Sequence, residues 1–278
     1  MKTILITGAT SGIGYEAAIV LAREGHRVVM VGRDKAKTER CVAEVKQKSG
    51  ATNVEYLLGD FASLASVRAL AAEFLAKYDR LDVLVNNAGT VYDTRTVTVD
   101  GFEATWAVNH LAPFLLTKLL LERVVQSAPA RIVNVSSVGH YRASMDLNDV
   151  GYEKGGYFIM GAYARSKLAN VLMTRSLAKQ LEGKDVTVNA LHPGAVATNI
   201  WAGAPGWSKP LIGIVKSLFM ISPAKGAETI TYLASSPEVE GKTGLYFEKN
   251  KAKKPSALAL DDALAEQVWK LSEEQVKA

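Results

Sequence analysis

Tyr163 and Lys167 stand four positions apart in the segment AYARSKLAN (162–170), so they share one face of any helix that forms there. An ammonium group close to a phenol favours the phenolate and lowers a phenol pKa that is otherwise about 10. A phenol tuned in this way can exchange a proton with a substrate near neutral pH. The same spacing also occurs on ordinary solvated helices, so the pair alone leaves both interpretations open.

Short β-branched segments alternate with longer helical patterns along the chain, and several of the predicted strands are continuously apolar. Such strands are typical of a parallel sheet that is covered on both faces. The alternation predicts one α/β domain over 1–278, a doubly wound (Rossmann) parallel sheet of about seven strands flanked by helices. The predicted strands are 3–7, 27–32, 53–58, 81–86, 131–136, 185–191 and 243–247. The predicted helices are 12–24, 35–49, 63–78, 100–127, 161–182, 223–235 and 260–276, with Ser63 and Ser222 as N-caps.

Composition excludes several classes of function. The chain has 278 residues, 48% of them hydrophobic, and a net charge of +5, which suits a polyphosphate cofactor but gives no run of basic residues for nucleic acid. The basic segment KNKAKK (249–254) is predicted to be a solvated loop. Cys41 is the only cysteine, so no intrachain disulfide and no cysteine-based metal site is expected. The four histidines lack metal-binding spacing, and no metal is predicted: His26, His110, His140 and His192.

No targeting or membrane segment is expected. Apolar residues of the first predicted strand begin at Ile4, which leaves no room for a signal peptide or an amino-terminal anchor. The longest later apolar stretch, 210–221, is interrupted by Lys216 and is too short to span a bilayer. We therefore expect a soluble, cytoplasmic protein with no membrane span.

The first predicted strand runs directly into TGATSGIG (7–14), with Gly8, Gly12 and Gly14 at GxxxGxG spacing. Glycines permit a tight turn and a close backbone approach to a pyrophosphate, while the start of the next helix supplies unpaired N–H groups. The position of the loop within the first β-α-β unit predicts a dinucleotide site. Its predicted cofactor contacts are Gly8, Thr10, Ser11, Gly12, Ile13 and Gly14.

The end of the second predicted strand favours NADP(H) over NAD(H). An acid at this position would accept the ribose hydroxyls of NAD, but Gly32 stands there and Arg33 follows. A guanidinium can pair with the 2′-phosphate of NADP. Lys35 and Lys37 add positive charge nearby or are ordinary surface lysines. Asp34 is the alternative, because it reaches the ribose if the strand ends later than predicted.

Two further strand ends are predicted to contact the adenosine half of the cofactor. Asp60, followed by Phe61, stands at the end of the third strand, where a carboxylate can accept from the adenine amino group. The alternative for Asp60 is a cap of the helix that begins near Ser63. After the fourth strand, the small residues of NNAG allow a close approach of the backbone to adenine and ribose: Asn87, Ala88 and Gly89.

Six segments of the sequence resemble, in order, the motifs of the short-chain dehydrogenase/reductase family over essentially the whole chain: TGATSGIG, NNAG, Asn109, VNVSS, YARSK and HPGAVAT. The later motifs and the long insert between VNVSS and YARSK are most similar to the retinol dehydrogenase-like branch. Two features depart from the pattern. Many members of that branch carry an amino-terminal membrane anchor, and many NADP-preferring relatives have a basic residue where this chain has Ser11.

The resemblance assigns the catalytic roles. It implies that Tyr163 is the acid/base, that Lys167 is its partner and that Ser137 binds the substrate oxygen, with Ser136 as the rival serine. It implies that Asn109 kinks its helix around a water that relays protons to the lysine. It also implies that four residues line the nicotinamide: Pro193, Gly194, Val196 and Thr198.

The sequence thus predicts an NADP(H)-dependent oxidoreductase that interconverts an apolar aldehyde or ketone and its alcohol. The segments 138–160 and 198–222 carry aromatic residues and are predicted to cover the substrate. An epimerase or dehydratase and a non-catalytic nucleotide sensor on the same fold are the alternatives. Relatives pair the helices that correspond to 100–127 and 161–182 into homodimers or homotetramers. Alternatively, the apolar residues of these helices are simply buried against the sheet.

Overall fold

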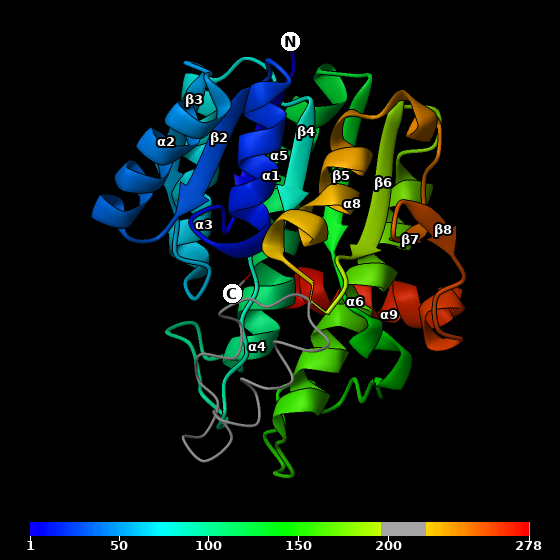
Figure 1. Cartoon of the computed structure of the whole chain (residues 1–278). Coiled ribbons are helices and arrows are strands. Elements are labelled where there is room, and N and C mark those ends of the chain that lie inside the picture. The colour runs from blue at the N-terminus through cyan, green and yellow to red at the C-terminus, as the bar shows by residue number, and fades with distance from the viewer. Residues whose placement is uncertain (196–220, 278) are drawn as a thin grey trace.

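Seven parallel strands and one antiparallel edge strand form the central sheet of the computed structural model, which describes residues 1–195 and 221–277 (Figure 1). Within these residues the strand order is β3-β2-β1-β4-β5-β6-β7-β8. The chain leaves β3 at one edge and re-enters the sheet on the other side of β1, at β4, so neighbouring crossovers diverge between β1 and β4. The strands are β1 (Thr3–Thr7), β2 (Arg27–Gly32), β3 (Val54–Leu58), β4 (Val83–Asn86), β5 (Ala130–Val135), β6 (Val186–His192), β7 (Tyr246–Glu248) and β8 (Lys251–Lys253).

Helices cover both faces of this sheet, as Figure 1 shows. One face carries α1 (Gly12–Arg23), α2 (Lys35–Ser49) and α8 (Pro223–Ser235). The other face carries α3 (Leu64–Lys77), α5 (Ala112–Gln126), α6 (Ile159–Gln180) and α9 (Asp262–Gln275). The predicted doubly wound α/β architecture is confirmed.

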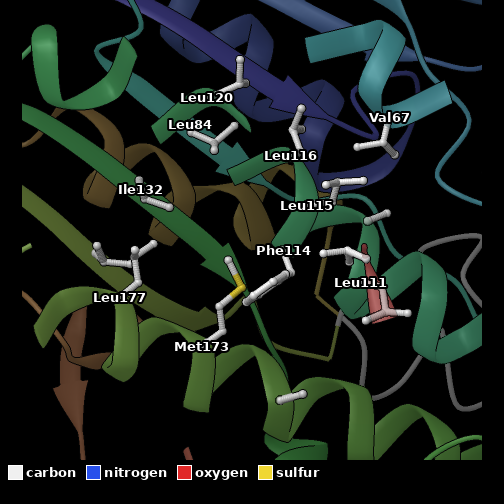
Figure 2. Packing of buried hydrophobic residues seen from close by; sticks show 14 of the residues in the cluster. Val67, Leu84, Leu111, Phe114, Leu115, Leu116, Leu120, Ile132, Met173 and Leu177 are labelled. Carbon is white, nitrogen blue, oxygen red and sulfur yellow. The ribbon is translucent and has the colours of Figure 1, made fainter. Parts of the chain in front are cut away.

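Alternate residues of each strand point into two separate apolar cores. In β1, Ile4 and Ile6 pack under α1 and α8, whereas Leu5 packs on the opposite side of the sheet. The second core is the larger, and in Figure 2 Phe114 of α5 points toward Met173 of α6. These fully covered strands explain the continuous apolar runs of the sequence.

Five of the eight α-helices that the structure describes begin at a side chain that caps the helix, as predicted for two of them. Ser63 accepts from Ser66 N at the start of α3, and Ser222 accepts from Lys225 N at the start of α8. In contrast, the N-cap of α1, Ser11, makes no side-chain hydrogen bond to the helix. The first N–H groups of α1 are therefore available to an anion beside the glycine loop.

The sheet has one strand more than the seven predicted. β8 lies within KNKAKK, which is predicted from the sequence to be a solvated loop, and it pairs antiparallel with β7. Lys249 and Asn250 both have positive φ (51° and 60°), which is the geometry of a two-residue hairpin turn. Three exposed residues at a sheet edge carry no apolar pattern, so periodicity could not indicate this strand.

The helix predicted at 100–127 is divided into three parts. It begins with α4 (Ala104–Trp106), continues as a π-helical segment (Ala107–Leu111) and then becomes α5. Asn109 is the central residue of the π-helical segment. The distortion expected at Asn109 is therefore present, and helical periodicity gave no sign of its type.

The carboxyl-terminal helix α9 packs against α6, and it contacts the α4–α5 segment through a hydrogen bond and an aromatic pair. Trp106 Nε1 donates to Gln275 Oε1 at 2.9 Å, and the rings of Phe114 and Trp269 meet edge-on at 4.8 Å between centroids. The apolar residues that suggested pairing between subunits are thus largely buried inside the chain. Assembly into a homodimer or homotetramer stays a prediction.

His110 makes the free energy of unfolding depend on pH. It is fully buried, its Nε2 lies 2.8 Å from Ser272 Oγ of α9, and burial lowers its pKa to about 4. In the unfolded chain a histidine titrates near 6.5, so as the pH falls below about 6.5 the unfolded state binds a proton that the folded state does not. This histidine therefore reduces stability by up to about 1.4 kcal/mol per pH unit in that window.

His110→Gln is expected to flatten the loss of unfolding free energy between about pH 6.5 and pH 5, because the variant cannot take up this proton. Urea unfolding at several pH values measures the slope. His26→Gln, at a less buried histidine, is the control and should change the slope less. An unaltered slope in His110→Gln would contradict the assignment.

Candidate active site

A cleft of about 890 Å³ runs along the carboxyl ends of the central strands. It brings together the glycine loop at one end and the serine, tyrosine and lysine motifs at the other. The predicted site residues that line it are Gly8, Thr10, Ser11, Gly12, Ile13, Arg33, Asp60, Phe61, Asn87, Ala88, Gly89, Ser137, Tyr163, Lys167, Pro193 and Gly194. Gly14 and Asn109 lie behind the lining, and Val196 and Thr198 lie outside the described residues, as does most of 198–222.

The glycine loop packs directly on the NNAG segment. Gly8 has a φ of +64°, and a Cβ there would lie 2.8 Å from the Cα of Ala88. A Cβ on Gly14 would lie 2.3 Å from Asn87 Nδ2, so this glycine serves the packing of α1 rather than the lining of the cleft. Side chains at either position would push the two segments apart. The loop therefore has the close approach that a dinucleotide site requires.

Thr7 and Asn87 hold these two segments in register. Thr7 Oγ1 accepts from the backbone N–H groups of Asn87 and Ala88, both at 2.9 Å. In return Asn87 Nδ2 donates to the carbonyl of Thr7 at 2.8 Å. The cradle is thus fixed by the chain itself, and its rigidity needs no bound group.

The adenosine end of the cleft has no room for the acid that NAD would need at the tip of β2. A Cβ on Gly32 would lie 2.2 Å from Thr38 Oγ1 and 2.6 Å from Thr10 Cγ2. Asp34 is the N-cap of α2 and accepts from Lys37 N at 2.7 Å, and it does not line the cleft. Exposed Arg33 and Lys37 do line it, and Lys35 does not.

Asp60 lines the cleft beside Phe61 and is not the helix cap that was considered as its alternative. Its Oδ1 accepts from Ala62 N at 3.0 Å within the turn that precedes α3, whereas Ser63 caps the helix. One carboxylate oxygen of Asp60 is thus used in the turn at the end of β3, where the adenine amino group of a cofactor is expected.

Asn109 connects the π-helical segment to the end of NNAG. Its Oδ1 accepts from Thr90 N at 2.8 Å, and its Nδ2 donates to Thr90 O at 2.9 Å. Its main-chain carbonyl accepts from Asn170 Nδ2 at 3.0 Å. Sequence reasoning missed Asn170. It stands seven residues after Tyr163 and three after Lys167, so the same helical spacing would have found it.

Ser137, rather than Ser136, has its hydroxyl at the tyrosine. The Ser137 hydroxyl is hydrogen-bonded to the Tyr163 phenol and also accepts from Gly139 N at 3.1 Å. Ser136 Oγ instead donates to the main-chain carbonyl of Lys167 at 2.7 Å. The first serine therefore ties β5 to α6, and the second faces the reactive phenol.

Burial dominates the protonation of the central pair. The Lys167 Nζ atom lies 5.6 Å from the centre of the Tyr163 ring and donates to Val135 O at 3.1 Å. Desolvation lowers the pKa of Lys167 to about 8. Desolvation also raises the pKa of Tyr163 above its usual value, and the hydrogen bond from Ser137 opposes this shift.

The lowered phenol pKa expected from the sequence is therefore wrong for the chain by itself. Taking the phenolate out of water costs more than the neighbouring groups recover. At neutral pH the phenol carries its proton and the lysine is mostly an ammonium group. This protonation state suits proton donation from Tyr163 rather than proton abstraction by it.

The segment 138–160 contributes its two ends to the cleft, and its middle does not line the cleft. Val138, Tyr141 and Met160 line the cleft and are 44%, 46% and 49% exposed, which gives the opening an apolar rim. The middle is held away from the cleft, with Arg165 Nη1 donating to Asp149 O at 2.6 Å. The covering role predicted for 138–160 stays a prediction, which the two ends of the segment that line the cleft support.

Residues 2–208 match the family model described as short chain dehydrogenase. The chain belongs to the short chain dehydrogenase family. The resemblance seen in the motifs is therefore confirmed, and hydride-transfer oxidoreduction is the activity of this family.

Curated relatives place this short chain dehydrogenase in the retinol dehydrogenase branch. It is 44% identical to retinol dehydrogenase 14 of Mus musculus over 287 residues, which covers 99% of this chain and 86% of that one. It is 39% identical to retinol dehydrogenase 13 of Homo sapiens over 272 residues, covering 96% and 82% of the two chains.

Solved structures agree with this assignment. An uncharacterized protein from Mycobacterium paratuberculosis superposes with a TM-score of 0.80 at 32% identity and covers 100% of this chain and 94% of that one. A short chain dehydrogenase from Escherichia coli CFT073 in complex with NADPH gives 0.69 at 27% identity, covering 90% and 97%. An NAD(P) nucleotide is thus the cofactor class of this family.

Among residues 1–195 and 221–277, no group of three or more His, Cys, Asp or Glu side chains is arranged to hold a metal ion. In the same part of the chain, no helix has the length and apolar character needed to cross a membrane.

Proposed function

We propose that this protein is an NADP(H)-dependent oxidoreductase that interconverts an apolar aldehyde or ketone and its alcohol, with Tyr163 as the acid/base. The observation that carries the proposal is the continuous cleft that joins Arg33 at one end to Ser137, Tyr163 and Lys167 at the other. Its two ends match the two ends of a dinucleotide, with the reacting groups at the nicotinamide end.

The residues present fit a nicotinamide dinucleotide. Gly8 and Gly12, both with positive φ, and the uncapped start of α1 form a cradle for a pyrophosphate. The bound cofactor supplies or accepts the hydride, and the protein supplies orientation and the proton. Lys167, nearly fully buried beside Gly89, is placed to donate to ribose hydroxyls.

The protonation states of Tyr163 and Lys167 indicate which group supplies the proton to the substrate. In the reducing direction the Tyr163 hydroxyl donates its proton to the carbonyl oxygen of the substrate as negative charge develops there. Ser137 donates a hydrogen bond to the same oxygen and stabilises that charge. Lys167, as an ammonium group 5.6 Å from the centre of the ring, favours the phenolate that remains.

Preference for NADP(H) over NAD(H) rests on the charges at the tip of β2. Arg33 and Lys37 line the cleft there, and Gly32 leaves no place for an acid that would repel a 2′-phosphate. Guanidinium groups pair well with phosphates, and partial exposure suits a reversible contact. The NADPH complex of the Escherichia coli relative supports this choice.

The apolar substrate class rests on the rim of the cleft and on the relatives. Val138, Tyr141 and Met160 expose apolar surface at the opening, next to the serine and the tyrosine. Two relatives are named retinol dehydrogenases, and all-trans-retinal is an apolar aldehyde of the proposed class. A cytoplasmic location is proposed on composition alone.

A screen of NADPH oxidation over aldehydes and ketones of graded size, including all-trans-retinal and nucleotide sugars, tests the proposal. We expect kcat/KM to rise with apolar chain length, by roughly 3- to 4-fold for each methylene that becomes buried. Conversion of nucleotide sugars with no net oxidation of NADPH, detected by product analysis, would favour the epimerase or dehydratase alternative, because such enzymes return the hydride to the substrate. Binding of NADPH without reduction of any carbonyl compound or conversion of any nucleotide sugar would favour the non-catalytic alternative.

A further inference from the structure

His140 stands three residues after the site serine and is fully buried behind it. Its Nδ1 atom lies 2.7 Å from the main-chain carbonyl oxygen of Ser137. On the other side of the ring, Ser256 N donates to Nε2 at 3.1 Å. The imidazole therefore bridges the site serine and a segment more than a hundred residues later in the chain.

The partners of the ring determine its tautomer. A main-chain N–H can only donate, so Nε2 must accept the hydrogen bond from Ser256. The proton of the neutral ring is then on Nδ1, which donates to the carbonyl of Ser137. Both ring nitrogens are satisfied in this one state. Protonation of Nε2 would place its N–H against the N–H of Ser256. Burial separately lowers the pKa of His140, so the neutral ring is favoured.

Two tyrosines hold the ring in this position. The ring centroids of Tyr141 and Tyr246 lie 4.1 Å and 4.7 Å from that of His140. The Tyr141 hydroxyl donates to Lys254 O at 2.7 Å, which ties the same carboxyl-terminal segment to the rim of the cleft. Tyr246 is fixed within β7, opposite Ala190 of β6. The imidazole is thus fixed by a strand and by a loop.

This arrangement sets the direction of the Ser137 hydroxyl. The carbonyl of Ser137 accepts from both the main-chain N and the Nδ1 of His140, at 3.2 Å and 2.7 Å. These two bonds hold the turn in which Gly139 N donates to Ser137 Oγ. With one lone pair of Oγ engaged in this way, the hydroxyl proton is left to point toward the phenol and the substrate oxygen.

We propose that His140 is a positioning residue for Ser137, and that its Nδ1–H bond to the serine carbonyl directs the serine hydroxyl toward Tyr163. The bond to Ser256 holds the ring and contributes to stability, but it does not set the direction of the hydroxyl. This inference rests on the proposed function for its kinetic readout. Its geometric readout is independent of activity.

Two amide variants separate the two bonds. In His140→Asn the amide nitrogen takes the place of Nδ1 and can still donate to the carbonyl of Ser137, while the acceptor for Ser256 is lost. In His140→Gln the side-chain carbonyl takes the place of Nε2 and can still accept from Ser256, while the donor to Ser137 is lost. Each variant removes one buried hydrogen bond, so similar losses of Tm are expected.

The kinetic result expected is asymmetric. His140→Gln should lose kcat by about 100-fold, as expected of a reacting group displaced by about 1 Å, with KM for NADPH unchanged. His140→Asn should keep kcat within roughly 3-fold of the parent chain. Equal losses in the two variants, or full activity in His140→Gln, would overturn the proposal while the parent's activity keeps the proposed function intact.

Crystal structures of the two variants provide the second readout. The separation of Ser137 Oγ from the Tyr163 hydroxyl should lengthen in His140→Gln and stay at the parent value in His140→Asn. An unchanged separation in both variants would overturn the proposal. If the parent chain reduces no carbonyl, the proposed function fails, and these structures still decide the role of His140.

Discussion

Tyr163→Phe is expected to reduce kcat for carbonyl reduction by about 10³-fold, within the range of a lost general acid. The phenol is hydrogen-bonded to the Ser137 hydroxyl, and its raised pKa keeps the proton in place at neutral pH. The phenylalanine ring keeps the same packing over Lys167, so the dissociation constant for NADPH should change little. Steady-state kinetics together with a fluorescence titration of NADPH measures both quantities.

Tyr157→Phe is the matched control for this substitution. Its hydroxyl donates to Tyr92 O at 2.8 Å, and Tyr157 does not line the cleft. We expect this variant to lose a small amount of stability and to keep its turnover. A Tyr163→Phe enzyme with more than about a tenth of the parent kcat would refute the acid/base assignment.

Arg33→Ala is expected to weaken the binding of NADPH by roughly 10- to 100-fold and the binding of NADH by much less. The reason is that a hydrogen bond between charged groups contributes about 1.5 to 3 kcal/mol. Arg33 is exposed at the tip of β2, so salt should reduce the effect. Dissociation constants for both nucleotides, measured at two ionic strengths, give the result.

Two lysines of the same turn provide the controls. Lys37 lines the cleft and Lys35 does not, although both lie in the first turn of α2. Lys37→Ala should show a smaller selective loss for NADPH, and Lys35→Ala should show none. An equal loss of affinity for NADPH and for NADH in Arg33→Ala would contradict a contact between Arg33 and the 2′-phosphate.

The elements of the cofactor site could be predicted from the sequence because each is a local signal. The glycine loop follows a strand and opens a helix, Arg33 follows the end of another strand, and NNAG ends a third. In a parallel sheet these ends meet at one edge, so strand order was not needed to bring them together. The packing of Gly8 on Ala88 holds two of these strand ends together.

The features that sequence reasoning missed depend on distant contacts or on the environment. The effect of burial on Tyr163 needs the finished fold, because spacing to Lys167 says nothing about desolvation. The tautomer of the His140 ring follows from its bond with Ser256, which lies far along the chain. β8 is a pairing of exposed residues with β7 and carries no apolar period.

The transfer of deuterium from NADPH that carries deuterium at both C4 positions of the nicotinamide ring tests the central claim most directly. With the best carbonyl substrate of the graded series, mass spectrometry of the alcohol should find the label on the former carbonyl carbon. Its rate of appearance should fall by about 10³-fold in Tyr163→Phe. An unlabelled alcohol, or equal rates in the parent and in Tyr163→Phe, would contradict the account.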